Sequence, residues 1–354
     1  MSTLWDTNGS AIVKELAAQR RTGGAVMSGV ALTLVVVADE DRVADAEAAA
    51  AAAAEVHPCR LLVVVRRQVE APSPRLDAEV LIGGRLGLHA ESVVLPLLAA
   101  DAPVVTWWYG DPPDRIQTDA LGVIANRRIT DSWMAGDGVD ALRRRAEDFA
   151  PGDTDLSWTR STPWRSTLAS TLDAVVGRRG GPVRVLGGQV VGDPENPTAQ
   201  LVAGWISARC GCTVTVEAGQ RSTGSKGIDT VVLTLDEDEE VRLTDDRKGG
   251  AVISQPYRPD STVALPKRTL GELIGEEMKR LDSDEPYREA LEAATGVAGL
   301  ADRAPVREHV WFDPMRPAPT APQVPADSVE DDEVAQTGTG PGDDDGGDDL
   351  PGDR

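Results

Sequence analysis

The chain has 354 residues, of which 36 are Lys or Arg and 58 are Asp or Glu, so its formal net charge is −22. This balance argues against a protein that binds nucleic acid or an anionic membrane, because clustered positive charge supplies most of that affinity. Hydrophobic residues make up 41% of the chain, which is enough to form buried cores and excludes a fully disordered protein. The length predicts about two domains.

The cysteine content points to a reducing compartment. The three cysteines are Cys59, Cys210 and Cys212, an odd number that is too small for a disulfide framework, so we expect a cytoplasmic protein. Two arginines before the apolar stretch Ala25–Ala38 imitate an export signal. This stretch is too short to span a bilayer, and we interpret Val30–Val37 as a buried strand.

The first 150 residues alternate between helix and strand patterns and form the predicted N-terminal domain. A helix around Ile12 and Leu16 leads into an apolar β-branched strand at 32–37. An alanine-rich helix at 44–54 and a second apolar strand at 61–65 complete a βαβ unit. The other elements expected here are a strand at 78–82, a helix at 91–100, a strand at 103–109 and a helix that ends at Phe149.

An interdomain segment at 151–165 is predicted to join this domain to a C-terminal domain at 166–315. Thr162-Pro163 and Asn196-Pro197 are each typical of a helix start, and Thr269 with Glu272 has the spacing of a capping box. Another helix is expected after Asp284. Strands are expected at 183–186, 212–216, 229–235, 241–243 and 251–254. The sequence therefore predicts two α/β domains, with parallel or mixed sheets flanked by helices.

The C-terminal residues have a different composition. From Arg316 onward the chain is rich in Pro, Ala, Gly, Asp and Glu, which cannot bury enough apolar surface to offset the entropy of ordering. Residues 321–354 contain 11 acidic residues and one Arg, so 1 − 11 = −10 of the net charge lies here. We predict a disordered acidic tail at 316–354 that keeps the protein solvated, in preference to a segment that docks a partner.

Glycine-rich stretches were tested against phosphate-binding motifs. Gly219–Gly227 contains a lysine at the wrong position for a phosphate loop, and a strand follows it where a helix is needed. Gly83–Gly87 and Gly187–Gly192 follow predicted strands but lack dinucleotide-binding spacing. We interpret the first stretch as a loop between strands and the other two as tight turns, and we predict no cofactor site.

The histidines and cysteines, which could bind a metal or act as nucleophiles, are scattered along the sequence. His57, His89 and His309 have no neighbours at metal-ligand spacing, so no metal site is predicted. The sequence His57–Arg60 reads as a strand entrance in preference to a nucleophilic pair, and Cys210 and Cys212 read as buried small hydrophobes at a helix end. No Gly-x-Ser-x-Gly elbow is present, and we predict no catalytic residue.

Aromatic residues give a stronger signal. Trp107 and Trp108 are adjacent on one predicted strand, so their rings point to opposite faces, and we expect one of them to face outward. Trp158, Trp164 and Arg165 lie in or just after the interdomain segment and have the composition of interface anchors. Two interpretations stay open: these rings clamp the two domains together, or they bind a partner.

Several short strings in order along the chain resemble one protein family. They are His57-Pro-Cys-Arg60, Val93–Leu98 leading into Pro103–Trp108, Asp131-Ser132, Asp155-Leu-x-Trp158 and Thr162-Pro-Trp-Arg165. Over residues 5–312 the chain resembles the OpcA proteins, glucose-6-phosphate dehydrogenase assembly proteins. The acidic tail lies outside this resemblance.

The resemblance implies a non-catalytic activator or assembly factor. Such a protein binds glucose-6-phosphate dehydrogenase and promotes its active form in the oxidative pentose phosphate pathway, which makes NADPH. Some photosynthetic members are under thiol redox control, and the resemblance assigns no redox role to Cys59, Cys210 or Cys212. The residues expected at the partner surface are Trp107, Trp108, Trp158, Trp164 and Arg165.

Two alternatives to this reading remain. One is an α/β enzyme or sensor that acts on a sugar phosphate or nucleotide, with its site near Gly110 and Asp111 at the carboxyl ends of strands. The other is a passive scaffold for the dehydrogenase, which would bind the enzyme without altering its kinetics.

Overall fold

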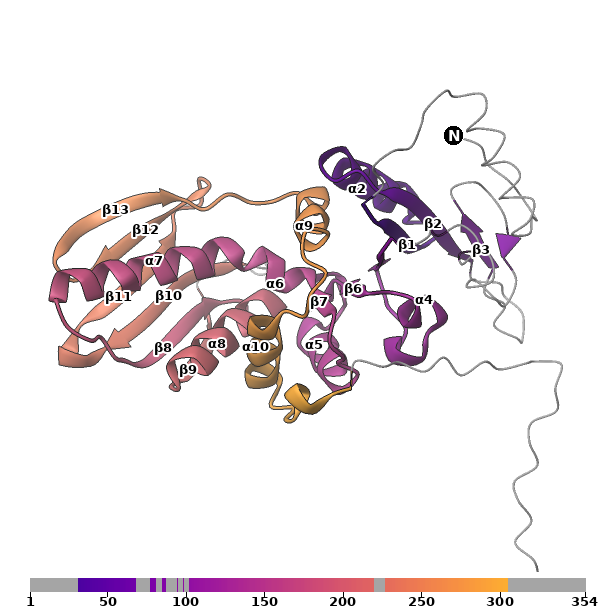
Figure 1. Ribbon diagram of the computed structural model, residues 1–354. Coiled ribbons are helices and arrows are strands. Elements are labelled where there is room, and N and C mark those ends of the chain that lie inside the picture. Colours follow the sequence, from indigo (N-terminus) through magenta and orange to yellow (C-terminus); the bar gives the residue numbers. More distant parts are fainter. Residues whose placement is uncertain are drawn as a thin grey trace, which may run out of the picture. The chain divides into compact units, whose positions relative to one another are not determined.

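In a computed structural model, the described residues are 31–67, 77–80, 85–86, 94, 98, 102–219 and 227–304. They belong to one unit of the structure, and within it they form two β-sheets with helices (Figure 1). The helix expected around Ile12, most of the helix expected at 91–100 and the acidic tail lie outside the described residues.

The first sheet is built around the predicted βαβ unit, which is confirmed. Strand β1 (Thr33–Asp39) continues through helix α2 (Val43–Val56) into β2 (Arg60–Arg67), and the two strands pair in parallel. Parallel strands also continue on the other side of β1. The remaining members are β3 (Asp77–Val80), β4 (Arg85–Leu86), β5 (Val104–Tyr109), β6 (Arg127–Thr130) and β7 (Asp153–Asp155), in the order β4-β3-β2-β1-β5-β6-β7. Strand β3 pairs antiparallel with both β2 and β4, and the other neighbouring strands pair in parallel.

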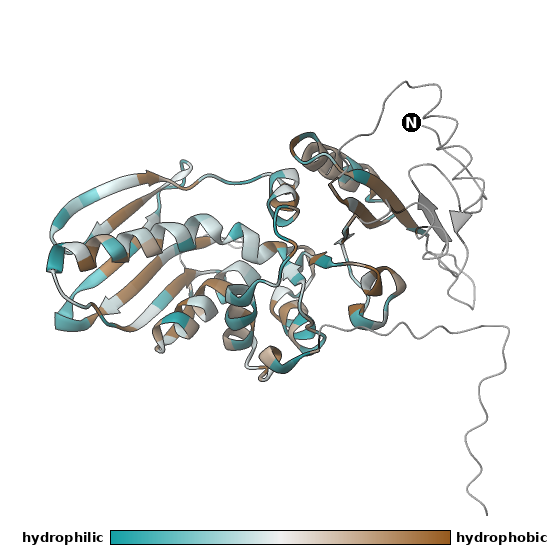
Figure 2. Cartoon of the chain, in the orientation of Figure 1, coloured by the Kyte–Doolittle hydropathy of each residue, from teal (hydrophilic) through white to brown (hydrophobic). Residues whose placement is uncertain are grey.

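This sheet is covered on both faces, so its central strands are buried along almost their whole length. All six residues of β5 are buried, and β1 is buried at six of its seven positions. Figure 2 shows brown, hydrophobic colouring along much of β1 and β2. Trp107 belongs to the core that α2 covers, and Trp108 belongs to the core on the opposite face, with Ile116 and Leu121. Each core therefore receives one of the two rings.

The second sheet is mixed, as predicted. Its strands are β8 (Val185–Gly192), β9 (Thr213–Ala218), β10 (Ile228–Leu235), β11 (Glu240–Asp245), β12 (Gly250–Gln255) and β13 (Arg258–Ala264), in the order β13-β12-β11-β10-β8-β9. Strands β8 and β9 are parallel, and the other neighbours are antiparallel. The sequence patterns missed β13, in which no residue is fully buried.

Helices α7 (Thr162–Arg179) and α8 (Pro197–Cys210) pack on one face of the second sheet (Figure 1). Both helices begin where the sequence predicts, with a proline in the first turn, and each ends at a left-handed glycine. Side chains on β11 alternate between buried and exposed, as expected for a sheet with one covered face.

The glycines of β8 correct one expectation. Gly187, Gly188 and Gly192 lie inside the strand and do not form the tight turn expected there. A β-carbon at Gly188 would stand 2.8 Å from the carbonyl oxygen of Val232 on β10. Glycine at this position therefore permits a close approach of two strands.

The C-terminal helices return to the first sheet, which the expected domain division at 166–315 did not foresee. Helix α9 (Leu270–Glu277) begins with the predicted capping box at Thr269 and Glu272, and its residues Leu273 and Ile274 join the core beneath α2. Helix α10 (Glu285–Thr295) packs against α8 and against α5 (Gly138–Glu147). The first sheet also extends past residue 150, because β7 follows it.

The other described helices are short. They are α4 (Ala120–Val123), α6 (Leu156–Arg160) and the 3₁₀ turns Ile116–Thr118, Ser132–Met134, Asp236–Asp238 and Leu300–Asp302. Among the described helices, none has the length and apolarity that a bilayer crossing requires.

Candidate functional site

In the interdomain segment, the carboxylate of Asp155 accepts several hydrogen bonds from its neighbours. Asp155 ends β7 and caps α6 by accepting a hydrogen bond from Ser157 N at 2.9 Å. It also accepts bonds from the hydroxyls of Thr130 and Ser132, both at 2.7 Å. Asp155 is completely buried. Because this buried carboxylate has its hydrogen bonds satisfied, it holds β6, β7 and α6 together.

Arg160, at the end of α6, forms a second connection to the first sheet. Its Nη1 and Nη2 atoms donate to the two carboxylate oxygens of Asp131 at 2.6 and 2.7 Å, which is a bidentate pair. The guanidinium carbon also lies 5.5 Å from the ring centroid of Trp133, within cation–π range. These contacts fix the direction of the Arg160 side chain.

Trp158 is the centre of the interdomain segment. Its ring is buried, and its Nε1 donates to Asp284 Oδ2, just before α10, at 2.9 Å. The guanidinium carbon of Arg165 lies 3.4 Å from the ring centroid, and Arg165 Nε donates to Ser161 Oγ at 2.7 Å. Burial lowers the pKa of Arg165 to about 10. Trp158 therefore connects the interdomain segment to the C-terminal helices, and Arg165 covers one face of its ring.

Helix α9 is held to the same segment by Glu277. This carboxylate accepts hydrogen bonds from Arg127 Nε on β6 at 2.9 Å and from Thr159 Oγ1 on α6 at 2.6 Å. Arg127 also donates from Nη1 to the carbonyl oxygen of Asp282 at 3.0 Å. The first sheet, the interdomain segment and α9 thus share one buried polar network.

The structure places the five predicted partner-binding residues in different environments. Trp107 and Trp108 are both buried, so the expectation that one of them faces outward is wrong; the sheet has a core on each face and takes one ring into each. Trp158 lies among the helices that include α10, and Trp164 lies in the core of the second sheet. Only Arg165 of the five is half-buried, with its guanidinium over Trp158.

Sequence reasoning missed the residues that organise this region. Arg127 and Arg128 are buried in β6, and Trp133 stacks with Arg160. Arginines are rare in strand interiors, so the pattern of β6 did not indicate a buried strand. The one available signal was Asp131-Ser132, a string of the resemblance that lies between these residues.

A cavity of about 240 Å³ lies at the carboxyl edge of the first sheet, where the enzyme alternative would place its site. Gly110, Asp111 and Asp131 line it together with Arg144 and Arg145 of α5. Open α/β sheets bind nucleotides at such an edge through a glycine-rich turn after the first strand.

The corresponding turn in this chain has a different character. Asp39 ends β1, and Glu40, Asp41 and Arg42 connect it to α2, so this turn has no glycine and carries three carboxylates. Such a turn does not fit a dinucleotide pyrophosphate, which requires close approach of backbone amides. Among the described side chains, no group of three His, Cys, Asp or Glu residues is placed to hold a metal ion.

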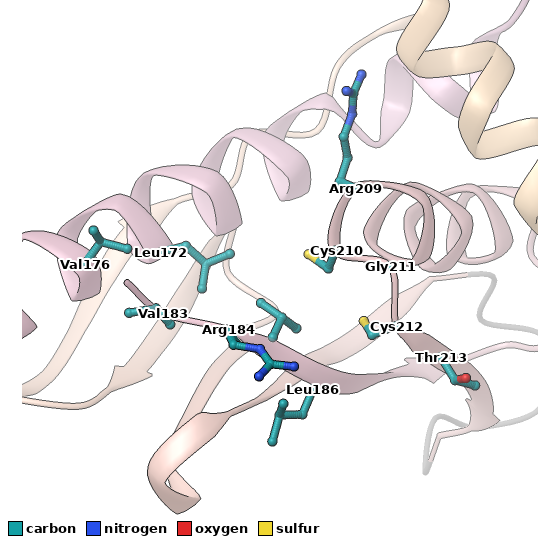
Figure 3. A pocket seen from close by; sticks show the side chains of 11 residues that line it. Leu172, Val176, Val183, Arg184, Leu186, Arg209, Cys210, Gly211, Cys212 and Thr213 are labelled. Carbon is teal, nitrogen blue, oxygen red and sulfur yellow. The ribbon is translucent and has the colours of Figure 1, made fainter. Parts of the chain in front are cut away.

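The cysteines occupy structural positions. Cys59 stands at the entrance to β2, as predicted, and burial raises its pKa to about 11. Cys210 ends α8 and Cys212 precedes β9 across the left-handed Gly211, and both line a groove with Leu172 (Figure 3). Both pack against the core of the second sheet and are half-buried, and burial raises the pKa of each thiol.

Family models match most of the described chain. Residues 50–147 match the glucose-6-phosphate dehydrogenase subunit N-terminal domain of OpcA, and residues 151–291 match the corresponding C-terminal domain. The chain belongs to the OpcA family. The two OpcA domain models meet between residues 147 and 151, next to the boundary expected at residue 150. The C-terminal model spans the interdomain segment and most of α10.

Other comparisons add little to this assignment. No curated protein matches the OpcA chain. Solved structures with partial similarity include an oxidoreductase from Sinorhizobium meliloti, at 11% identity and a TM-score of 0.34 over 77% of this chain and 90% of the other. An inositol dehydrogenase homologue from Azotobacter vinelandii has 8% identity and a TM-score of 0.35 over 74% and 86%. An oxidoreductase from Pseudomonas syringae has 10% identity and a TM-score of 0.36 over 77% and 90%. At these values the similarity supports no statement about function.

Proposed function

We propose that this chain is a non-catalytic activator that binds glucose-6-phosphate dehydrogenase and promotes its active form in the cytoplasm, in the oxidative pentose phosphate pathway. The observation that carries the proposal is the match, in tandem over residues 50–291, to both domains of a family described as a glucose-6-phosphate dehydrogenase subunit. The acidic turn after β1 also favours a binding role over nucleotide chemistry at the first sheet.

An activator of this kind acts through differential affinity. It shifts the dehydrogenase toward its active state only by as much as it binds that state more tightly than the inactive one. A rigid binding surface serves this purpose, because little conformational entropy is lost on association. The network of Asp155, Trp158 and Glu277 supplies such rigidity beneath the interdomain segment.

The five candidate residues divide into two roles within this proposal. Trp107, Trp108 and Trp158 are buried and position the surface from beneath. Trp164 is buried in the core of the second sheet, so Arg165 is the member that a partner reaches. A half-buried arginine stacked on an indole is pre-organised for contact with a carboxylate or an aromatic ring.

The proposal is tested by co-purification of the pure chain with glucose-6-phosphate dehydrogenase. We expect a stable complex that Arg165→Ala weakens, because the variant removes the reachable cation. Arg178→Ala, near the exposed end of the same helix α7, is the matched control and should leave the complex intact. Circular dichroism of each variant shows whether it folds. The absence of a complex with the unaltered chain would refute the proposal, and a complex unaffected by Arg165→Ala would remove Arg165 from the surface.

A further inference from the structure

A second cavity, of about 320 Å³, shares no lining residue with the cavity at the carboxyl edge of the first sheet. The interdomain segment, the start of α8 and the connection between β13 and α9 all contribute to its lining. We call it the Trp133–Trp164 cavity after the two indoles in its wall. Its volume falls within the range of sites that bind small molecules.

One part of the wall is flat and apolar. Trp133 and Trp164 line the cavity with Pro163, Leu265 and Pro266. Trp133 is half-buried and is held by its stack with Arg160, whereas Trp164 is anchored in the core of the second sheet. Fixed indole and proline faces suit a planar ring, because stacking requires little reorganisation of the protein.

Another part of the wall is cationic. Arg160, Lys267 and Arg268 line the cavity. Arg160 is paired with Asp131 and Arg268 with Glu276, so their charges are largely compensated. Lys267 is exposed and forms no ion pair with any residue that the structure describes. The cavity therefore offers a lysine ammonium with its donors available to an anion.

The start of α8 points to the same chemistry. Asn196 caps this helix of 14 residues by accepting from Thr198 N at 2.9 Å, and both residues line the cavity. Thr198 is only 6% exposed, yet its hydroxyl has no hydrogen-bond partner among the described residues. A buried hydroxyl without a partner is costly, and an acceptor in the cavity would satisfy it. The helix dipole favours an acceptor that carries negative charge.

Asp245, at the end of β11, is the acidic residue of the lining. Its Oδ1 accepts from Arg247 N at 2.9 Å, which fixes the carboxylate in place. A carboxylate repels phosphate but accepts hydrogen bonds from sugar hydroxyls, the role that an acidic residue has toward ribose in dinucleotide-binding folds. The lining thus combines aromatic faces, an acceptor for hydroxyls and donors for an anion.

We propose that the Trp133–Trp164 cavity binds a mononucleotide. The base packs on the indoles, the ribose hydroxyls donate to Asp245, and the phosphate accepts from Lys267 and the Thr198 hydroxyl. This site goes beyond the proposed binding of the dehydrogenase and does not depend on it, because the isolated chain should bind the ligand.

The test is calorimetric titration of the full chain with AMP, and with adenosine, ribose 5-phosphate and inorganic phosphate as partial ligands. We expect saturable binding of one AMP per chain, with each partial ligand at least about tenfold weaker, since a hydrogen bond to a charged group contributes about 1.5–3 kcal/mol. No binding of AMP at millimolar concentration overturns the proposal. Equal affinity for inorganic phosphate would show a plain anion site, and equal affinity for ribose 5-phosphate would show a sugar phosphate site; either result overturns it.

Variants locate the binding. Thr198→Val removes the hydroxyl while nearly keeping the shape, and Lys267→Ala removes the ammonium; each should weaken AMP binding about tenfold or more. Lys279→Ala, an exposed lysine outside the lining, is the matched control and should bind AMP as the unaltered chain does. If the two cavity variants bind AMP normally, the ligand lies elsewhere and the proposal is wrong. An equal loss in Lys279→Ala would show non-specific attraction and would also overturn it.

Discussion

Arg127 and Glu277 form a buried ion pair although 150 positions separate them in the chain. The Arg127 side chain is 1% exposed and that of Glu277 is 6% exposed. The pair joins β6 of the first sheet to α9, a helix that follows the second sheet in the sequence. Packing of α9 on α2 and this ion pair together hold the C-terminal part of the chain to the N-terminal sheet.

Replacing Arg127 should therefore destabilise the fold strongly. Arg127→Met leaves Glu277 as an uncompensated buried charge, which costs about 3–5 kcal/mol of the free energy of unfolding. Urea unfolding followed by circular dichroism measures the change. Arg143→Met is the control, because its ion pair with Glu147 is exposed and should contribute about 0–1 kcal/mol.

The double variant Arg127→Met with Glu277→Met separates the loss of the ion pair from the cost of leaving one buried charge unpaired. It removes both charges, so it should be more stable than Arg127→Met alone. If Arg127→Met is no less stable than Arg143→Met, the ion pair does not hold α9 to the sheet.

The contact between Arg165 and Trp158 should appear as a coupling energy. The guanidinium lies 3.4 Å from the ring centroid and is partly desolvated, so we expect a coupling of about 0.5–2 kcal/mol. A double-mutant cycle with Arg165→Ala and Trp158→Leu measures this energy from four unfolding curves, because leucine removes the aromatic face. Strict additivity of the two changes would show that the stack contributes nothing to stability.

Two glycines offer a matched comparison of backbone packing. Gly188→Ala places a β-carbon 2.8 Å from the Val232 carbonyl oxygen and should cost about 1–3 kcal/mol, because β10 cannot move away without losing its pairing. Gly177→Ala, in α7, meets no atom within 4 Å and should stabilise the protein by about 0.5–1 kcal/mol. Thermal unfolding of both variants checks this. Equal melting temperatures would contradict the close approach of β8 and β10.

The thiol of Cys59 should be unreactive in the folded chain. Burial raises its pKa from 9.0 to about 11, so at pH 8.5 the thiolate population is about 100-fold smaller in the folded state than in the unfolded state. Alkylation by iodoacetamide, read at the Cys59 peptide by mass spectrometry, should be correspondingly slower before unfolding. Equal rates in the two states would contradict the burial.

The same shift gives the sign of a pH effect on stability. The folded state holds the Cys59 proton more tightly than the unfolded state does. Below pH 9 the thiol is protonated in both states, so it does not lower the free energy of unfolding. Stability should fall as pH rises from 9 through 11, and Cys59→Ser should show a smaller fall over that range. If the free energy of unfolding falls equally steeply with pH in Cys59→Ser, other groups cause the loss of stability at alkaline pH.

Local patterns were sufficient to predict much of this fold. The β-branched residues at 33–37, the alanines of α2 and the proline and glycine boundaries of α8 act within a few positions, so sequence alone reveals them. The adjacent indoles of Trp107 and Trp108 were assigned to opposite faces, but the second core that encloses Trp108 is built from distant residues.

The remaining features depend on contacts between distant parts of the chain. Strand β6 is buried although it contains Arg127 and Arg128, because their partners are Glu277 and Asp153. Helix α9 carries an ordinary apolar stripe, and nothing in that stripe indicates whether the helix packs on the first sheet or on the second. The Trp133–Trp164 cavity likewise gathers residues from separate stretches of the chain, so no single motif indicated it.

The central claim is that this chain alters the activity of glucose-6-phosphate dehydrogenase and does more than bind it. The most direct test is the initial rate of the dehydrogenase over a range of glucose 6-phosphate concentrations, at a fixed enzyme concentration, with increasing amounts of the pure chain. Our account predicts a saturable change in the substrate dependence toward higher activity, and no turnover by the chain alone. A complex with unchanged kinetics would show a passive scaffold, and turnover without the dehydrogenase would show an enzyme; either result contradicts the account.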